Sequence, residues 1–366
     1  MDIRAIDLYR LEVPLHTPFK TAVREVNSAQ SIVVAIHTDD GSCGWGAAPA
    51  TAKVTGETLD TIAGVIRDPL SALLIGRPLE DFNGLLDTLH GGIEGNYSAK
   101  AALEIALYDL RARSLGVPLY KLFGGDGSPL QTDLTISVNP PKKMVTDASH
   151  AVANGYRILK LKVGNDVAED LERITAVHAA VGDGIQLRLD INQGWSAKET
   201  VRALAILEKR DIVPELLEQP VPAEDIAGLR YIRERVAAPV MADESVFSPM
   251  QTIRLLEQGA ADIINIKLMK AGGLSRALLI AQIARLYGAE CMMGCMLETS
   301  ISAAAAAHLT SAFGAGIQKI DLDAPGLCQY DAVTGATRFD GPSIELNHSP
   351  GLGIEGPGHI RGLTAI

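Results

Sequence analysis

The sequence predicts an α/β barrel that follows a smaller antiparallel and helical region. From about residue 134, short apolar runs alternate with helical stretches, which is typical of βαβ units and a parallel sheet. A polar or ionisable residue stands at or near the end of almost every run, and the successive gaps are 27, 28, 28, 25, 24, 28 and 26 residues. Each gap has the length of one βα unit. Before this region, residues 3–14 and 31–38 read as strands, and Asp39-Asp40-Gly41 is a hairpin signal.

The composition is that of a folded chain with an excess of negative charge. Of 366 residues, 47% are hydrophobic and 21% charged, and the formal net charge is −11. The apolar content is ample for a buried core, and the charged content argues against disorder. The net charge argues against nucleic acid and an anionic membrane surface as partners, and no run reaches the ~18 apolar residues of a membrane span. A small anionic substrate stays compatible, because a local site can oppose the overall charge.

Cysteine usage and the N-terminal residues favour the cytoplasm. The four cysteines match no zinc motif, and four in a chain of this length do not make a disulfide scaffold. The N-terminal residues Met1-Asp2-Ile3-Arg4 begin no apolar segment of a secretory signal. A reduced, cytoplasmic compartment is therefore expected, and association into a homo-oligomer is left open.

The chain divides at two changes of composition. Residues 47–123 are expected to be mainly helical, and Gly124-Gly125-Asp126-Gly127 then marks a boundary. After Asp323 the chain becomes rich in Gly and Pro, with a hairpin-like stretch near 335–344. The predicted parts are an N-terminal α+β region at residues 1–125, a barrel at 126–323, and a C-terminal segment at 324–366 that packs back on the N-terminal region.

The eight evenly spaced units predict a closed sheet. Eight βα units close into a (β/α)₈-type barrel, whose active site lies at the C-terminal ends of the strands. An open dinucleotide-binding sheet is disfavoured, because the first βα turn lacks its glycine fingerprint. The predicted strands are 134–138, 158–163, 185–191, 216–218, 240–242, 263–268, 290–294 and 317–322, and the residues near their ends are Thr135, Lys162, Asp190, Glu218, Asp243, Lys267, Cys295 and Asp321.

Three consecutive strand ends carry carboxylates. Asp190, Glu218 and Asp243 would converge at the mouth of the barrel, where they repel one another unless a cation lies between them. Ligation by oxygen alone suits a hard ion, so Mg²⁺ fits better than zinc. The alternative is that each is an ordinary strand-end acid in an ion pair with a neighbouring Lys or Arg.

Lysines flank these three strands on both sides. Lys160 and Lys162 lie two apart on one strand and so face the same side. Their mutual repulsion, with a cation nearby, is expected to lower the pKa of one amine and make it a usable base. Lys267 follows an apolar run on the other side. The alternative for the pair is a set of salt bridges to the acids. Bases on two faces of a metal-bound carboxylate would remove a proton on one side and return it on the other, through an enediolate that the cation stabilises.

In these residues the chain resembles the enolase superfamily, and within it the muconate-lactonizing subgroup. The resemblance implies a capping domain, built from the N-terminal part and the C-terminal tail, over a modified (β/α)₇β barrel. It also implies that Lys160 assists Lys162 and contacts the substrate carboxylate. The motifs that carry it are Lys160-Leu161-Lys162, Asp190 with Asn192, Glu218-Gln219-Pro220, Asp243-Glu244-Ser245 and the Lys267 strand.

Asp321-Leu322-Asp323 narrows the resemblance to dipeptide epimerases, in which such a motif binds the free α-ammonium of the substrate. The alternative is a cap of the following helix or loop. Arg24 resembles an arginine that meets the glutamate side chain in the epimerases of Ala-Glu dipeptides, and the alternative is a solvated loop residue. By the same resemblance, Thr135, Cys295 and Leu297 line the pocket. A nucleophilic role for Cys295 is disfavoured, because no neighbouring His motif supports it.

The predicted protein is therefore an isomerase that requires Mg²⁺. It would be a dipeptide epimerase of murein-derived L-Ala-D/L-Glu, inverting the α-carbon of the C-terminal residue with Lys162 and Lys267 as the two bases. The alternatives within the subgroup are an N-acylamino-acid racemase, an o-succinylbenzoate synthase or a cycloisomerase. The alternative of another class is a non-catalytic barrel that binds an anion or a metal.

Overall fold

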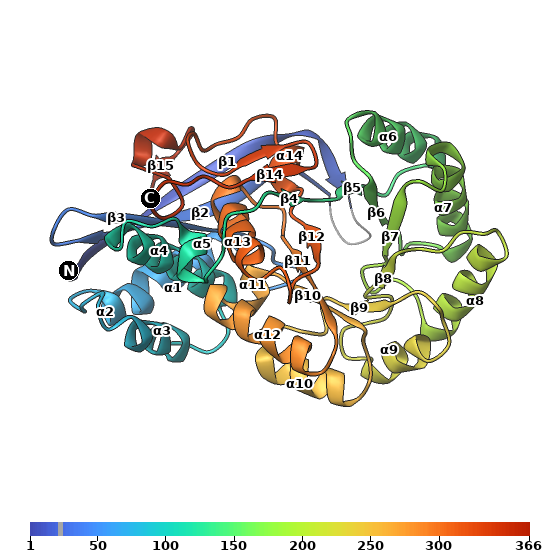
Figure 1. The fold of residues 1–366 in the computed structure, drawn as a ribbon, viewed down its shortest axis with the longest axis horizontal. Helices are drawn as coiled ribbons and strands as arrows, with labels where there is room; N and C mark the ends of the chain where they lie inside the picture. The colour runs from blue at the N-terminus through green and yellow to red at the C-terminus, as the bar shows by residue number, and fades with distance from the viewer. Residues whose placement is uncertain (21–24) are drawn as a thin grey trace.

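The computed structural model describes residues 1–20 and 25–366, so the candidate Arg24 lies outside the described residues. Eight strands form one parallel sheet in the order of the sequence, and the α/β barrel is confirmed. Helices α6 to α10 form an arc around these strands (Figure 1). The strands are β5 (Leu134–Ile136), β6 (Ile158–Lys162), β7 (Gln186–Asp190), β8 (Leu216–Glu218), β9 (Val240–Ala242), β10 (Ile263–Ile266), β11 (Glu290–Gly294) and β12 (Lys319–Asp321).

Seven helical connections join the eight strands, which is the (β/α)₇β arrangement. After β12 comes only the four-residue helix α14 (Ala324–Leu327), so the eighth βα unit expected from the spacing is incomplete. The connecting helices are α6 (Pro141–Ala153), α7 (Val167–Val181), α8 (Ala197–Glu208), α9 (Ile226–Arg233), α10 (Pro249–Glu257), α11 (Leu268–Ala271) with α12 (Leu274–Leu286), and α13 (Ser300–Ala312).

Side chains close the barrel between its first and last strands. Within the described residues, β5 and β12 share no ladder. Instead, the Thr135 N–H donates to Asp323 Oδ2 at 2.6 Å, and the Leu322 N–H donates to Thr132 Oγ1 at 2.8 Å. The buried Arg188 donates to the Ile320 carbonyl across the interior at 2.8 Å. At this seam, polar contacts of side chains join the first and last strands, whereas backbone hydrogen bonds join the other neighbouring strands.

The interior of the barrel has an apolar layer beneath its polar mouth. Leu216, Met241, Ile263 and Met292 form a separate cluster of buried side chains from four adjacent strands. Residues two apart on a strand share a face, so Leu216 lies one layer below Glu218. This layer supports the polar side chains from below and keeps water out of the barrel centre. No described helix is both long and apolar enough to cross a membrane.

The N-terminal region is an antiparallel sheet in the order β15-β1-β2-β3. Its long strands extend past the predicted limits, and the third covers part of the stretch expected to be helical. This strand packs closely on α4: a Cβ at Gly46 would lie 2.0 Å from the Ala102 carbonyl oxygen. The strands are β1 (Ile3–Lys20), β2 (Glu25–Thr38) and β3 (Cys43–Pro49), and the helices are α1 (Leu59–Val65), the π-helical turn Ile66–Leu70, α2 (Ser71–Leu74), α3 (Phe82–Gly91), α4 (Tyr97–Ser114) and α5 (Leu119–Leu122).

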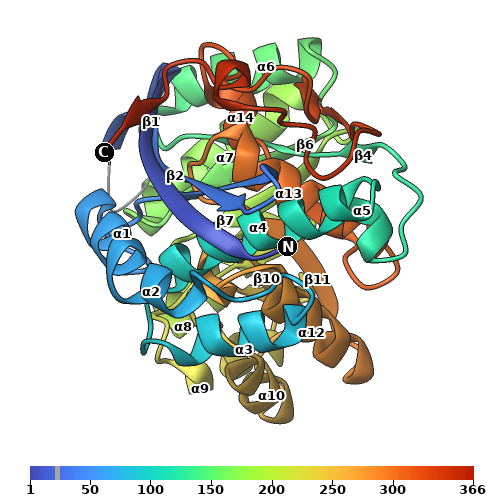
Figure 2. The same cartoon turned by 90° about the vertical axis from the view of Figure 1, so that its left-hand side faces the viewer.

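The C-terminal residues contact the N-terminal sheet. Figure 2 shows this sheet at the front of the molecule, with the C-terminus next to β1. The buried Asp109 of α4 accepts from the backbone N–H groups of Trp45 and Leu352 at 2.8 and 2.6 Å, and so holds both segments. The predicted domain boundaries stay predictions. The remaining elements are β4 (Leu130–Gln131), β13 (Arg338–Asp340), β14 (Ser343–Glu345), the 3₁₀ turn Pro357–His359 and β15 (Thr364–Ala365), which pairs with β1.

His308 of α13 joins three segments of the chain. Its Nδ1 accepts from the Tyr120 N–H at 3.2 Å, and its ring stacks on that of Tyr120 with centroids 5.6 Å apart. Thr337 of the C-terminal segment contacts Nε2 at 3.3 Å. The ring is fully buried. Burial, with a smaller effect of His348, lowers the pKa of His308 to about 3.

This lowered pKa predicts a loss of stability in acid. Below about pH 6.5 the unfolded chain protonates His308 while the folded chain does not, so stability falls by about 1.4 kcal/mol per pH unit as the pH approaches 3. We expect His308→Gln, which removes the titrating ring and keeps a polar group near the Nε2 position, to flatten this slope in urea unfolding between pH 4 and 6.5. His16→Gln, at an exposed position in β1, should keep the wild-type slope. Equal slopes for the two variants would rule out this role of His308.

Candidate active site

A pocket opens at the C-terminal ends of the barrel strands, where the strand-end residues were expected to meet. Asp190 and Glu218 do not line it, because they lie fully buried behind lysine side chains. Phe19, Thr51, Lys53 and Val54 from the N-terminal region also face it. Of the predicted site residues, those that line the pocket are Thr135, Lys160, Lys162, Asp243, Lys267, Cys295, Leu297, Asp321 and Asp323.

Strand register brings the acids and lysines together. Lys162 pairs with Asp190 across β6 and β7, and Asp190 pairs with Glu218 across β7 and β8. Paired positions on neighbouring parallel strands point the same way, so the three side chains form a row across the barrel mouth. Asp243 and Lys267 follow directly after β9 and β10 and continue this row.

Lys160 lies at the centre of the buried charges. Its side chain is 2% exposed, and Nζ lies 3.0 Å from Asp190 Oδ2, 2.7 Å from Glu218 Oε2 and 2.7 Å from Asp321 Oδ2. Lys162 donates to the same Asp190 oxygen. One buried amine therefore bridges the acids of β7 and β8 to the acid of β12, on the other side of the barrel.

The second lysine group surrounds Asp243. Lys267 Nζ donates to Asp243 Oδ2 at 2.7 Å. Lys270, which sequence reasoning missed, donates to Asp243 Oδ1, to the Asp243 carbonyl at 2.6 Å and to the Asn265 carbonyl at 3.0 Å. Its spacing of three residues from Lys267, one turn of the helix α11, was the available signal. Asn265, also missed, donates to Glu218 Oε1 at 2.9 Å.

The crowding of acids shifts their titration. Burial, followed by Asp190, raises the pKa of Glu218 to about 7, even though Lys160 opposes the shift. Burial and then Asp243 raise the pKa of Glu244 to about 7. Two neighbouring carboxylates thus resist full ionisation, which is the condition that an added cation relieves.

Two of the buried lysines, Lys160 and Lys267, have pKa values above the usual value. Burial lowers the pKa of Lys160, but Asp190, Asp321 and Glu218 outweigh it and hold the pKa well above its usual value. Asp243 likewise overcomes burial and raises the pKa of Lys267. The expected lowering by mutual repulsion assumed a cation among the acids. It concerns one amine of the pair Lys160 and Lys162 and stays a prediction. In the structure the carboxylates contact Lys160 and Lys267 directly, and this attraction outweighs burial.

The donor set at the row of acids fits a hard divalent cation. Three carboxylates on adjacent strand ends supply only oxygen ligands, as Mg²⁺ prefers. Among residues 1–20 and 25–366, Glu218 Oε2 lies close to Lys160 but receives no well-directed hydrogen bond, and Glu244 Oε2 and Asn192 Oδ1 are buried without a hydrogen-bond partner. These oxygens have coordination capacity that the protein itself leaves unused.

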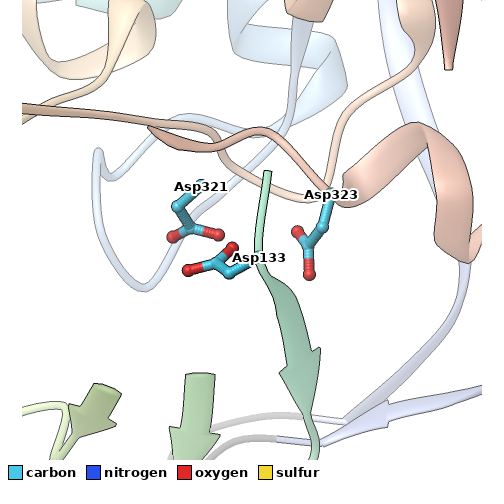
Figure 3. Close-up of side chains that lie close together, drawn as sticks. All are labelled: Asp133, Asp321 and Asp323. Carbon is cyan, nitrogen blue, oxygen red and sulfur yellow. The ribbon is translucent and has the colours of Figure 1, made fainter. Parts of the chain in front are cut away.

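A second group of acids lies across the pocket. Among the residues that the structure describes, the one set of three acids with oxygens all within 4.8 Å is Asp133, Asp321 and Asp323, and this set could also hold a cation (Figure 3). Asp190, Glu218 and Asp243 do not form so tight a set, because lysine amines lie between them.

The Asp-x-Asp pair has the burial and contacts of a binding site. Asp323 stands at the N-cap of α14, yet its side chain makes no cap bond and accepts from the Thr135 N–H instead. This disfavours the helix-cap alternative. Lys160 overcomes burial to lower the pKa of Asp321 to about 2, whereas burial and Asp321 raise the pKa of Asp323 to about 6. Burial and Asp321 also raise the pKa of the Cys295 thiol well above its usual value, which opposes a nucleophilic role.

Chemically, the pocket offers opposed groups around one small substrate. Acidic oxygens suit a cation on one side, and a second acidic pair suits an ammonium on the other. Amines from β6 and from the end of β10 lie on either side of the strands that carry the first acids. Such an arrangement suits proton transfer at a carbon between a carboxylate and an amine.

Both parts of the chain match known families. Residues 5–124 match the mandelate racemase / muconate lactonizing enzyme N-terminal domain, and residues 143–357 match the enolase C-terminal domain-like family. The chain is 49% identical over 356 residues to the L-Ala-D/L-Glu epimerase of Clostridium acetobutylicum, with 97% of this chain and 99% of that protein covered.

Solved structures show the same similarity. A substrate-liganded complex of the L-Ala-D/L-Glu epimerase from Bacillus subtilis superposes with a TM-score of 0.95 at 44% identity, covering 97% of this chain and 99% of that one. A dipeptide epimerase from Enterococcus faecalis V583, complexed with Mg and the dipeptide L-Leu-L-Tyr, gives a TM-score of 0.93 at 37% identity, covering 97% and 100%.

Lys270 is expected to be essential for stability. Lys270→Met leaves two backbone carbonyls and an oxygen of Asp243 without their buried donor, and loss of one partner from a buried ion pair costs about 3 kcal/mol or more. We expect urea unfolding to show a loss of this size. Lys198→Met, at an exposed position on α8, is the matched control and should change stability little. A difference below about 0.5 kcal/mol between the two variants would contradict the role given to Lys270.

Proposed function

Because the chain belongs to the mandelate racemase / muconate lactonizing enzyme family of the enolase superfamily, we propose that it is an isomerase, a dipeptide epimerase that acts on L-Ala-D/L-Glu. One observation carries the proposal: the Asp-x-Asp pair, Asp321 and Asp323, lines the same pocket as Lys162 and Lys267. A pocket with acids at one end and two amines near a row of carboxylates suits a molecule that has a free ammonium and a terminal carboxylate.

The two acids of β12 and its C-terminal end would bind the substrate's α-ammonium. They are buried, and the Asp323 side chain is held in place by the Thr135 N–H. Charge-assisted hydrogen bonds from an ammonium to buried carboxylates are strong and directional. Cys295 and Leu297, which face the same pocket, would contact the dipeptide backbone.

Mg²⁺ would be held by Asp190, Glu218 and Asp243. When bound, it supplies positive charge beside the terminal carboxylate and so favours the electron-rich form of the substrate. The lysines that now contact these acids would then be free to face the substrate. Lys160 would turn its charge toward the substrate carboxylate and stabilise the same developing charge.

Lys162 and Lys267 would act as the two bases. One amine takes the α-proton of the C-terminal residue on one face, and the other, in its ammonium form, returns a proton on the opposite face. Inversion follows because the two side chains come from strands on either side of β7, β8 and β9. The amines of Lys162 and Lys267 are themselves buried, and a bound substrate that displaces water from them would be protected from protonation by solvent on the wrong face.

The choice of side chain is proposed to depend on Arg24, whose guanidinium would pair with the substrate glutamate. A forked donor matches a planar carboxylate. The N-terminal region also brings Lys53 to the pocket, so the part of the site that meets the side chain is compatible with an acidic group.

The cytoplasmic location stays a prediction. The four free cysteines are compatible with it.

The rivals within the family differ in what they do with Asp321 and Asp323. An N-acylamino-acid racemase, an o-succinylbenzoate synthase or a cycloisomerase acts on a substrate without a free ammonium. Such a substrate would leave Asp321 with Lys160 as its shared counter-charge and would bring none to Asp323. A non-catalytic binding barrel has no need of amines on both sides of the metal site. The dipeptide epimerase uses all of these groups.

Deuterium exchange tests the proposed function. In D₂O with Mg²⁺, we expect L-Ala-L-Glu to gain one deuterium at the α-carbon of Glu and to reach a mixture of epimers with unchanged skeleton. Lys162→Ala and Lys267→Ala should each lower epimerisation by about 10³-fold or more, while each retains exchange of one epimer only, and of opposite epimers. The measurement is mass spectrometry with chiral separation.

The control variant is Lys198→Ala, which should exchange and epimerise as the wild type does. Turnover of N-acylated amino acids without activity on free dipeptides would overturn the proposal. The binding barrel would be favoured by two results together: the wild type shows no exchange activity, and both lysine variants still bind the ligand.

A further inference from the structure

Asp133 is a buried acid that neither the sequence motifs nor the two-base chemistry uses. It directly precedes β5 and lies two residues before Thr135, on the same face of the strand. Its side chain is fully buried. Figure 3 shows Asp133 between Asp321 and Asp323, with its carboxyl group turned toward that of Asp321. It does not line the pocket, so it lies beneath the floor that the other two acids form.

The charges around this floor do not balance. Asp133 Oδ2 accepts from Arg188 Nη1 at 2.7 Å, and Asp321 accepts from Lys160 at 2.7 Å. Asp323 accepts from the neutral Thr135 N–H and forms no ion pair with a cation of the described residues. Three carboxylates thus meet two cations, and one of these, Lys160, is shared with acids of the metal site. Buried acids this close resist full ionisation until another positive charge arrives.

Asp133 also has an unused oxygen. Its Oδ1 is buried and has no hydrogen-bond partner within the described part of the chain. An unpartnered buried acceptor costs free energy, and the ion pair with Arg188 uses only the other oxygen, Oδ2. A cation bound above Asp321 and Asp323 would be attracted by the negative charge of Asp133.

We propose that Asp133 is a positioning residue of the ammonium subsite, a third carboxylate beneath Asp321 and Asp323 that makes the pocket selective for substrates with a free, positively charged amine. The inference rests on the proposed function and names the group that discriminates dipeptides from N-acylated amino acids. Asp133 attracts the substrate ammonium electrostatically and affects the ionisation of Asp321 and Asp323. It does not contact the reacting atoms.

The same arrangement predicts that the empty subsite holds a proton which the substrate ammonium replaces. Burial and Asp321 raise the pKa of Asp133 well above its usual value, although Arg188 opposes the shift. The charged or titratable groups that act on Asp133 are Asp321, Asp323, Arg188, Lys160 and Tyr156, and Cys295 faces Asp321 and Asp323.

Asp133→Asn provides the first test. The amide keeps the shape, its oxygen can accept from Arg188, and its NH₂ can donate to Asp321, so only the charge is lost. At the separations of a few ångströms involved, loss of one charge is worth about tenfold or more in affinity for a cation. We expect KM for L-Ala-L-Glu to rise about tenfold with kcat changed less than about threefold. The inhibition constant of N-propionyl-L-glutamate, the same molecule without its ammonium, should not rise.

Glu215→Gln is the matched control. Glu215 accepts from Nε of the same Arg188 at 2.6 Å but lies outside the ammonium subsite. Both variants remove one carboxylate from one guanidinium, so a purely structural role predicts equal effects on the two ligands. The proposal predicts that only Asp133→Asn lowers the discrimination between them. Equal losses for the dipeptide and its des-amino analogue in Asp133→Asn would overturn it.

The wild-type protein decides the matter if Asp133→Asn fails to fold. Calorimetric titration with Mg²⁺ at about pH 6.5, in two buffers of different ionisation enthalpy, counts the protons released on binding. The dipeptide should release more protons than N-propionyl-L-glutamate, and equal release would contradict the proposal. If the wild type epimerises no dipeptide, the proposed function fails instead; if it does so and Asp133→Asn keeps the wild-type KM, only the inference about Asp133 fails.

Discussion

The contacts of one buried amine determine the arrangement of this site. Lys160 Nζ lies within 3.0 Å of carboxylates from β7, β8 and β12, and thereby joins the predicted metal site to the predicted ammonium site. An amine in the middle of a barrel is costly unless acids surround it, and the acids in turn repel one another unless a cation separates them. Each charge can be buried only because the others are there. The strand register and the apolar layer below them hold this set in place.

The network is better suited to function than to stability. Buried ion pairs contribute little net stability, because desolvation offsets their attraction, and apolar side chains would fill the barrel at lower cost. What the network provides is acids and amines already fixed in position before a ligand arrives, so little reorganisation is needed on binding. The pKa values of Glu218 and Glu244, both near 7, indicate carboxylates that still lack positive charge. Asp323, with a pKa of about 6, indicates the same on the opposite side of the pocket.

Much of this could be predicted from the sequence, since strand ends of a barrel repeat at regular spacing and converge in space. That regularity pointed to Asp190, Glu218, Asp243 and the lysines, and the structure brings them together. Other features depended on tertiary contacts without a local pattern. Lys270 becomes important only because α11 folds its amine back onto Asp243, and Asp133 only because the barrel seam brings β5 beside β12. The raised pKa of Lys160 depends on tertiary contacts in the same way, because acids from three strands surround its amine. The expected lowering of the pKa of one amine beside a bound cation stays a prediction. The eighth βα unit is likewise incomplete: the chain beyond α14 runs to β15, which pairs with β1.

The central claim is that the acids form two separate sites for positive charge, joined by Lys160. A crystal structure with Mg²⁺ and L-Ala-L-Glu tests it most directly. We expect the metal ion among Asp190, Glu218 and Asp243, the substrate ammonium at Asp321 and Asp323, and the α-carbon of Glu between the amines of Lys162 and Lys267. A metal ion bound instead by Asp133, Asp321 and Asp323, with the dipeptide ammonium elsewhere, would contradict the account.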